Sequence, residues 1–219
     1  MREAPLWLYR ICQQIIKAYL WLFKRYNVVT KENFPADGPV LVCGNHLSNS
    51  DCLCICAESP VLVHFIAKRS LFKFKSFGNL IRYFGAFPVK PRFENEKPKS
   101  IDPSGDKISA IEYSMKLLKD GKCVGLFPEG HRKKTWENSG YNIRSGAGVL
   151  AIETGCKVVP VGIIGGEKLF EKTTMVVGKP QIFEKQTDKI YTHEDYVEIS
   201  KEILREAYRL ADAKPPFEK

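Results

Sequence analysis

Short apolar runs rich in β-branched and aromatic residues alternate with longer stretches of helical pattern along most of the chain. The runs are Val40–Cys43, Val61–Ala67, Tyr83–Val89, Cys123–Phe127 and Val158–Ile163. Several are separated by ten or more residues with helical periodicity, such as Ile108–Lys119, which ends before Gly121. This alternation predicts a single α/β domain with a largely parallel central sheet flanked by helices.

Two further segments lie outside this alternation. The polar stretch Glu94–Asp106 contains two prolines and is predicted to be a surface loop. Thr192 and Asp195 have the spacing of a capping box, which predicts the start of a charged helix that continues to about Ala213.

The first thirty residues have a different pattern. Within Leu6–Tyr26, apolar residues recur at three- and four-residue steps, and the opposite face carries Arg10, Gln13, Gln14, Lys17, Lys24 and Arg25. This pattern predicts a basic amphipathic helix, with Trp7 and Trp21 suited to a membrane interface. The helix can pack on the protein core, lie on a membrane surface, or do both. No run reaches the roughly 18 apolar residues that a bilayer-spanning helix needs, so we expect no segment to cross a membrane.

Composition and charge narrow the class of partner. The 219 residues include 34 Lys and Arg against 25 Asp and Glu, a formal net charge of +9. Such a surplus favours a polyanionic partner, which could be nucleic acid, an anionic membrane or a phosphorylated small molecule. The seven cysteines form no CxxC pair, and no secretory signal peptide is visible, so we expect a reduced cytosolic chain with buried thiols.

The stretch Gly44–Asp51 is the most informative candidate site. A predicted strand ends at Cys43, and a helical pattern begins near Cys52, so His46 falls in the turn and Asp51 in the first helical turn. Ser48 or Asn49 is then a plausible N-cap. In that arrangement the carboxylate can fix the imidazole tautomer and leave the second ring nitrogen to take a proton from a hydroxyl. The alternative is that His46 only caps a turn and Asp51 only favours the helix start.

A second candidate stretch is Leu126–Arg132, at the end of another predicted strand. Open α/β sheets bind ligands at this edge. Glu129 is a candidate for hydrogen bonding a polyol hydroxyl, and Arg132 is a candidate phosphate clamp. The alternative is a tight turn with a solvated arginine. Four more basic residues come just after predicted strands and could converge on the same pocket: Lys68, Arg69, Lys90 and Arg92.

Together these blocks resemble the PlsC-type glycerolipid acyltransferases, a family that transfers an acyl chain from a thioester to a lysophospholipid. The resemblance covers about residues 34 to 180. Four ordered blocks carry it: Asn45-His46-(four residues)-Asp51, the HX4D pattern; Gly85-Ala86-Phe87-Pro88-Val89; Phe127-Pro128-Glu129-Gly130-His131-Arg132; and Val159-Pro160-Val161-Gly162-Ile163. Ala67-Lys68 with Leu71-Phe72 and Ser145-Gly146-Ala147-Gly148 also match the family.

The resemblance implies a role for each block. His46 and Asp51 correspond to the catalytic pair. The residues that it assigns to phosphate or acceptor binding are Lys68, Lys90, Arg92, Glu129, Gly130 and Arg132. Val159, Pro160 and Val161 correspond to an apolar strand near the acyl chain. The chain departs from the family where Lys90 and Pro91 intervene before Arg92, and where His131 replaces a threonine. We interpret His131 as a neighbour of the site and not as a catalyst.

The implied reaction moves a fatty acyl group from acyl-CoA or acyl carrier protein to the free hydroxyl of lysophosphatidate, giving phosphatidate for phospholipid synthesis. It implies an acyltransferase domain over residues 31–219 that follows a membrane-surface helix in residues 1–30. It requires no metal or cofactor, and it places the protein at the cytoplasmic side of the cell membrane as a peripheral protein, with no nucleic-acid partner.

Three alternatives stay open at this point. The same His/Asp pair could serve a thioester or lipid hydrolase, although no G-x-S-x-G elbow is present. The charge of +9 could reflect a nucleic-acid-binding protein, although the basic residues are dispersed and no nucleic-acid motif appears. The third is a non-catalytic phosphate-binding module.

Overall fold

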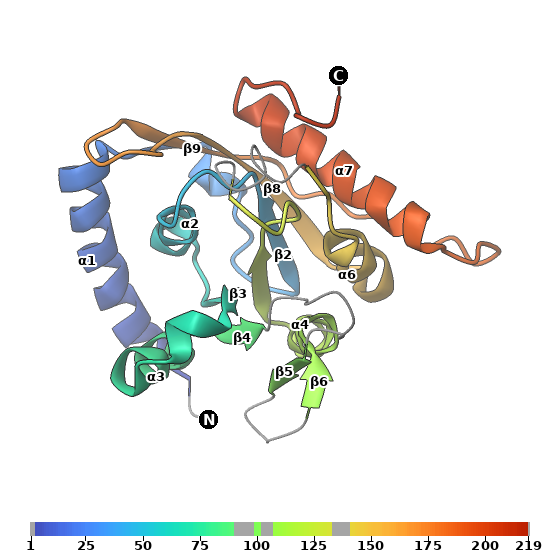
Figure 1. The fold of residues 1–219 in the computed structure, drawn as a ribbon, viewed down its shortest axis with the longest axis horizontal. Coiled ribbons are helices and arrows are strands. Elements are labelled where there is room, and N and C mark those ends of the chain that lie inside the picture. The colour runs from blue at the N-terminus through green and yellow to red at the C-terminus, as the bar shows by residue number, and fades with distance from the viewer. Residues whose placement is uncertain (1–2, 90–98, 102–106, 133–140, 219) are drawn as a thin grey trace.

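A seven-stranded sheet forms the centre of the molecule, with helices on both of its faces (Figure 1). The structure is a computed structural model that describes residues 3–89, 99–101, 107–132 and 141–218. The strand order is β1-β9-β8-β2-β7-β3-β4. The bounds of these strands are β1 Asn27–Val29, β2 Val40–Gly44, β3 Val63–Lys68, β4 Phe87–Val89, β7 Cys123–Leu126, β8 Lys157–Gly165 and β9 Thr173–Val177.

The sheet is mostly parallel, as predicted. Strand β2 lies at its centre and pairs in parallel with both β7 and β8, and β3 pairs in parallel with β7 and β4. Strand β9 is antiparallel to β8, and β1 is parallel to β9. The carboxyl ends of β2, β7 and β3 therefore meet at one edge, where ligands bind in open α/β sheets.

The helices divide between the two faces of the sheet. Their bounds are α1 Leu6–Lys24, α2 Asp51–Glu58, α3 Lys75–Tyr83, α4 Ala110–Lys119, α6 Gly146–Thr154 and α7 His193–Leu210, with short 3-10 turns η1 Lys31–Asn33 and η2 Arg69–Phe72. Helices α1 and α2 pack on one face, and α4, α6 and α7 pack on the other.

Alternation along β2 shows how the core is divided. Val40 and Val42 belong to the cluster that contains Leu20 of α1 and residues of α2, whereas Leu41 and Cys43 belong to the cluster that contains residues of α4, α6 and α7. All five residues of β2 are buried, which is why the strand reads as a continuous apolar run and not as an alternating one.

Several boundaries differ from the sequence predictions, three of them by more than a shift at a strand end. The run Tyr83–Val89 is a strand only over Phe87–Val89, because α3 extends to Tyr83 and a turn with Gly85 at φ +85° follows it. A strand, β5 Lys99–Ile101, occupies part of the segment predicted to be a loop, and it pairs with β6 Lys107–Ser109. The helix predicted from Ile108 begins instead at Ala110, because Ser109 and Glu112 form a capping box.

Strands β1 and β9 were not predicted. Each is short, and β9 is buried only at alternate positions, so neither forms a long apolar run. At the other end of the chain, the predicted capping box of Thr192 and Asp195 is confirmed. The helix that it begins ends at Leu210, three residues before the predicted end.

Helix α1 is present as predicted, and the side that faces the protein combines the apolar Tyr9 and Leu20 with the polar Gln13 and Lys24. Gln13 is buried and donates from Nε2 to the carbonyl oxygens of Cys56 and Ser59, at 2.8 and 2.7 Å. Lys17 pairs with Glu58 at 3.0 Å, and buried Lys24 donates to the carbonyl oxygen of Gly166. The large apolar side chains that α1 exposes are Leu6, Trp7, Ile11, Ile15, Tyr19, Trp21 and Leu22. In the described part of the chain, no helix has the length and apolar character to cross a bilayer.

Candidate active site

The turn between β2 and α2 brings His46 and Asp51 into contact. Because β2 ends at Gly44 and α2 begins at Asp51, the histidine lies in the turn and the aspartate at the first helical position. The two side chains meet with 2.8 Å between His46 Nδ1 and Asp51 Oδ2. Since an ionised carboxylate only accepts, Nδ1 donates the proton in this bond, and Nε2 is left as the basic nitrogen.

Asp51 is held in place by three other donors. Its Oδ2 accepts from the backbone N–H of Leu47 and of Ser48, at 2.7 and 2.8 Å. Its Oδ1 accepts from the Ser48 hydroxyl at 2.7 Å. The carboxylate is 1% exposed, so these bonds replace the water that it loses. The N-cap residue is Ser50, without a side-chain capping bond, so the prediction of Ser48 or Asn49 as the cap was wrong.

An aromatic side chain packs against one face of the His46 ring. It stacks on Phe127 with 4.1 Å between ring centroids and 8° between planes. The His46 side chain keeps 20% of its surface exposed, so the ring remains reachable from outside. Phe127 directly follows β7, so the neighbouring strand supports the imidazole.

Asn45 anchors this turn to the sheet and was missed by sequence reasoning. Its Nδ2 donates to the carbonyl oxygen of Ile163 at 2.8 Å, and the N–H of Ile163 donates back to Asn45 Oδ1 at 2.7 Å. The paired bonds continue the hydrogen bonding of β8 beyond the end of β2. A polar residue directly before His46 was the available signal for this role.

Glu129 lies beneath the turn and points into the protein. It is 2% exposed; its Oε2 accepts from the N–H of His46 at 3.2 Å, and its Oε1 accepts from the Tyr208 hydroxyl at 2.7 Å. Burial and the neighbouring Glu129 carboxylate raise the pKa of Tyr208, which keeps that hydroxyl a donor. The contacts of Glu129 support the turn, and its binding of an acceptor stays a prediction. Tyr208 lies 79 residues away in sequence, and no local pattern indicated it.

Basic groups gather beside the turn that follows β7. His131 and Arg132 are exposed there, and Lys68 is the exposed last residue of β3. The pKa of His131 is lowered, first by burial and then by its electrostatic interactions with Arg144, Lys68 and His46, so these groups lie near it. Lys90 and Arg92 lie outside the described residues.

Arg144 is a basic residue that sequence reasoning missed. Its backbone N–H donates to the carbonyl oxygen of Pro128 at 2.9 Å, which places it over the turn. Gly130 has φ +69°, and a Cβ there would lie 3.2 Å from Arg144 Cγ, so the turn needs glycine at this position. The structure therefore gives Gly130 a conformational role and places the Arg144 side chain next to it.

The residues predicted to lie near the acyl chain form the middle of β8. Val159, Pro160 and Val161 are buried, and both valines pack in the same cluster as residues of α1 and α2. They lie beside the His46 turn, because Val161 pairs with Gly44. Their contact with an acyl chain stays a prediction.

Other chemistries find little support in the described residues. All seven cysteines are free, and four of them are buried. Burial raises the pKa of Cys52 to about 11 and also raises that of Cys43, Cys54, Cys56, Cys123 and Cys156, so these thiols stay protonated and weakly nucleophilic at neutral pH. The described part of the chain contains no group of three or more metal-ligating side chains.

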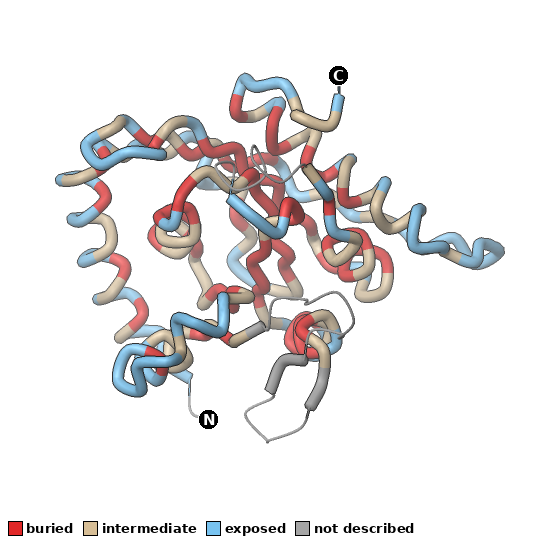
Figure 2. The backbone as a smooth tube through the Cα atoms, viewed as in Figure 1, coloured by how far each residue is buried: buried red, intermediate tan, exposed pale blue. Residues whose placement is uncertain are grey.

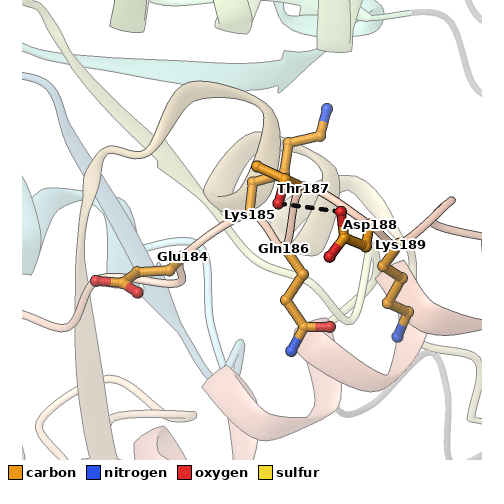
Figure 3. A pocket seen from close by; sticks show the side chains of 6 residues that line it. All are labelled: Glu184, Lys185, Gln186, Thr187, Asp188 and Lys189. Atoms are coloured by element: carbon orange, nitrogen blue, oxygen red, sulfur yellow. Dashed lines mark hydrogen bonds between the residues drawn. The ribbon is translucent and has the colours of Figure 1, made fainter.

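A shallow hollow formed by Glu184–Lys189 lies on the loop that precedes α7 and is separate from the His46 turn (Figure 3). The side chains drawn there point in different directions, and one hydrogen bond, 3.5 Å from Thr187 to Asp188, joins two of them. The residues that line it include none of the catalytic candidates.

Comparison with known proteins agrees with this geometry. The model of the Acyltransferase family matches residues 25–164. A 1-acyl-sn-glycerol-3-phosphate acyltransferase of Bacillus subtilis is 31% identical over 79% of this chain and 82% of its own length. An enzyme of the same name from Borreliella burgdorferi is 27% identical over 72% of this chain and 58% of its own. The chain belongs to the Acyltransferase family of the PlsC type.

A solved structure shows the same fold. The 1-acyl-sn-glycerophosphate acyltransferase PlsC of Thermotoga maritima superimposes with a TM-score of 0.66 over 96% of this chain and 80% of that chain, at 22% sequence identity. The parallel sheet and its flanking helices are therefore those of a known acyltransferase fold.

Proposed function

We propose that this protein transfers a fatty acyl group from the thioester of acyl-CoA or acyl carrier protein to the free hydroxyl of lysophosphatidate, giving phosphatidate. The observation that carries the proposal is the 2.8 Å contact between His46 Nδ1 and Asp51 Oδ2 at the ligand-binding edge of the sheet. The names of the relatives supply the acceptor class.

In the reaction, His46 Nε2 takes the proton of the acceptor hydroxyl as its oxygen attacks the thioester carbon. The tetrahedral intermediate then collapses, the carbon–sulfur bond breaks, and the departing sulfur takes the proton from the imidazolium. Asp51 stabilises the imidazolium between these steps. The acyl group passes directly from sulfur to oxygen, so no side chain carries it.

The phosphate of the acceptor is bound by the basic groups beside this turn. Lys68, Arg132 and Arg144 lie on segments that meet there, and guanidinium groups bind phosphate in a two-pronged geometry. Lys90 and Arg92 are expected to add to the same binding surface.

Because the acceptor and product carry acyl tails, the enzyme works at a membrane surface. Helix α1, in residues 1–30, is the anchor of the acyltransferase domain in residues 31–219, and its outward apolar side chains lie in the interface of an anionic membrane. We therefore expect a peripheral protein on the cytoplasmic side of the cell membrane.

The direct test is incubation with a labelled acyl thioester and a small panel of lysophospholipids, followed by separation of the lipid products. We expect labelled phosphatidate, formed only when lysophosphatidate is present. Release of labelled free acid at the same rate with and without an acceptor would instead identify a hydrolase. Running acyl-CoA and acyl carrier protein thioesters in parallel identifies the donor.

A further inference from the structure

Like α1, the segment formed by η2 and α3 exposes several large apolar side chains. Figure 2 shows most of this segment as exposed. Phe74, between the two elements, is 79% exposed. The other exposed apolar side chains of the segment are Leu71, Phe77 and Leu80. Phe77 and Leu80 are three residues apart and share one face of α3.

These side chains are displayed by a packed structure. Gly78 lies so close to η2 that a Cβ at that position would be 2.9 Å from Phe72 Cα. The Arg82 guanidinium stacks over the Phe72 ring at 5.1 Å from its centroid. This internal packing therefore keeps the segment in a shape that leaves its other apolar side chains exposed.

The same segment carries only positive charge. Residues 68–83 contain no acidic residue and five basic ones: Lys68, Arg69, Lys73, Lys75 and Arg82. Lys73 and Lys75 are exposed, on either side of Phe74. On α1, by contrast, Lys17 and Lys24 are bound to other parts of the protein. Arg10 and Arg25 remain exposed there, and η2 and α3 add further positive charge that is available to an external anion.

The segment is connected to its surroundings at both ends. The N–H of Ala4, just before α1, donates to the carbonyl oxygen of Tyr83 at 2.9 Å, so the end of α3 is joined to the start of the proposed anchor. At its other end the segment follows directly from Lys68, one of the basic groups that act on His131 beside the site. The segment therefore links the anchor helix to the active site.

We propose that η2 and α3 form a second membrane-contacting element, in which Lys73 and Lys75 bind the headgroups of anionic phospholipids while Phe74 and Phe77 enter the interface. This inference rests on the proposed action at a membrane surface. It assigns different roles in membrane binding to α1 and to η2–α3. Helix α1 supplies most of the apolar insertion, and η2–α3 adds to the preference for anionic lipid and places the site entrance at the bilayer. Aromatic side chains between lysines suit a bilayer interface better than the polar surface of an acidic protein.

The charge arm of the test compares wild type with the double variant Lys73→Gln/Lys75→Gln by co-sedimentation with vesicles. Each lysine near an anionic surface contributes a factor of about five, so affinity for phosphatidylglycerol-containing vesicles should fall about twenty-five-fold. Affinity for pure phosphatidylcholine vesicles should stay the same. The matched control Lys179→Gln/Lys214→Gln changes two exposed lysines elsewhere and should bind both vesicles like wild type.

The apolar arm uses Phe74→Ser/Phe77→Ser, with Ile182→Ser/Ile190→Ser as the matched control at two exposed positions away from the segment. The phenylalanine variant should bind both kinds of vesicle at least about tenfold more weakly. The control should be unchanged, and both variants should melt close to the wild-type temperature, since all four side chains are exposed.

The inference is overturned if both η2–α3 variants bind vesicles like wild type. It is also overturned if they bind vesicles normally but lose binding to purified acyl carrier protein, because the surface would then serve an acidic protein. Acylation of detergent-dispersed lysophosphatidate by the wild type is the separate readout for the proposed function. If that activity is present while the variants bind vesicles normally, only the second membrane contact is wrong.

Discussion

Helices α1 and α7 have similar lengths, 19 and 18 residues, and both are amphipathic, yet they differ in the kind of side chain that they expose. Helix α7 buries its apolar residues Ile203 and Leu204 and keeps its charges outside, where Glu198 pairs with Lys201 and Arg205. Helix α1 buries Gln13 and Lys24 together with Tyr9 and Leu20, and it exposes most of its other large apolar side chains. A helix that exposes its apolar side indicates a surrounding other than water.

The two helices also differ in what they do for the site. Through Tyr208, α7 reaches Glu129, which accepts from the N–H of His46. Helix α1 contacts α2 through Gln13 and Lys17, with its outer surface free. Changes on the inward side should therefore alter turnover or folding, and changes on the outward side should alter only the encounter with lipid.

The largest expected effect comes from Asp51→Asn. Loss of the carboxylate leaves the imidazolium without its partner and no longer fixes the tautomer, so kcat should fall by about 10²- to 10⁴-fold, with little change in the acceptor KM.

As a contrast, Arg132→Ala should raise the acceptor KM more than Asp51→Asn does. Steady-state kinetics with lysophosphatidate measures both, and equal KM values for the two variants would contradict the clamp role of Arg132.

The outward side is tested by Trp7→Ser/Ile15→Ser. Both side chains are 65% exposed, so the melting temperature in solution should stay the same. Each contributes about 1.5 kcal/mol when buried in lipid, so vesicle affinity should fall about a hundredfold. The matched change on α7, Ile203→Ser, should destabilise the fold by about 2–5 kcal/mol. A large drop in melting temperature for the α1 variant would mean that α1 is an ordinary core helix.

A smaller effect is expected for Tyr208→Phe. Removing a buried hydrogen bond to a charged group costs about 2 kcal/mol, which corresponds to a fall of about 5 °C in melting temperature. The control lies on the same helix: Tyr196 donates to Glu153 at 2.7 Å on a more exposed surface, so Tyr196→Phe should shift melting by no more than about 2 °C. Equal melting temperatures for the two variants would argue against Glu129 as the support of the turn.

The smallest effect is expected at Glu3, just before α1, which interacts with His64 and Lys122. A hydrogen bond from His64, followed by interactions with Lys122, lowers the pKa of Glu3 to about 2, against the raising effect of burial. Because the folded pKa lies below the ordinary value near 4.5, this stability is present above that value and is lost as the pH falls towards 2. Glu3→Gln should therefore melt slightly earlier than wild type at pH 7, by less than about 1 kcal/mol since the carboxylate is partly exposed.

The two melting curves should converge near pH 2. A difference that persists there would show that Glu3 acts through something other than its charge. Vesicle binding by Glu3→Gln should match wild type, because the outward side of α1 is untouched.

Sequence predicted the parts of this molecule that depend on local pattern. The strand-to-helix change around Gly44–Asp51 was enough to place His46 and Asp51 together, because both lie in one short turn. The central strands were found as apolar runs, since parallel strands are buried on both faces.

What sequence missed depends on tertiary packing. Tyr208 and Arg144 reach the site from distant segments, and the inward direction of Glu129 follows from packing against α7. The two faces of α1 were visible in its periodicity, but periodicity does not say which face meets the protein. The short strands β1, β5 and β9 carry too few apolar residues to stand out.

The central claim is that the His46 imidazole is the base that activates the acceptor hydroxyl, and it is tested most directly by His46→Ala. Conversion of labelled acyl thioester and lysophosphatidate to phosphatidate is measured for wild type, His46→Ala and the control His193→Ala, an exposed histidine at the start of α7. The account predicts a loss of about 10²- to 10⁴-fold for His46→Ala, with an unchanged fold by circular dichroism, and wild-type turnover for the control. A folded His46→Ala variant that kept half of the wild-type activity would contradict it.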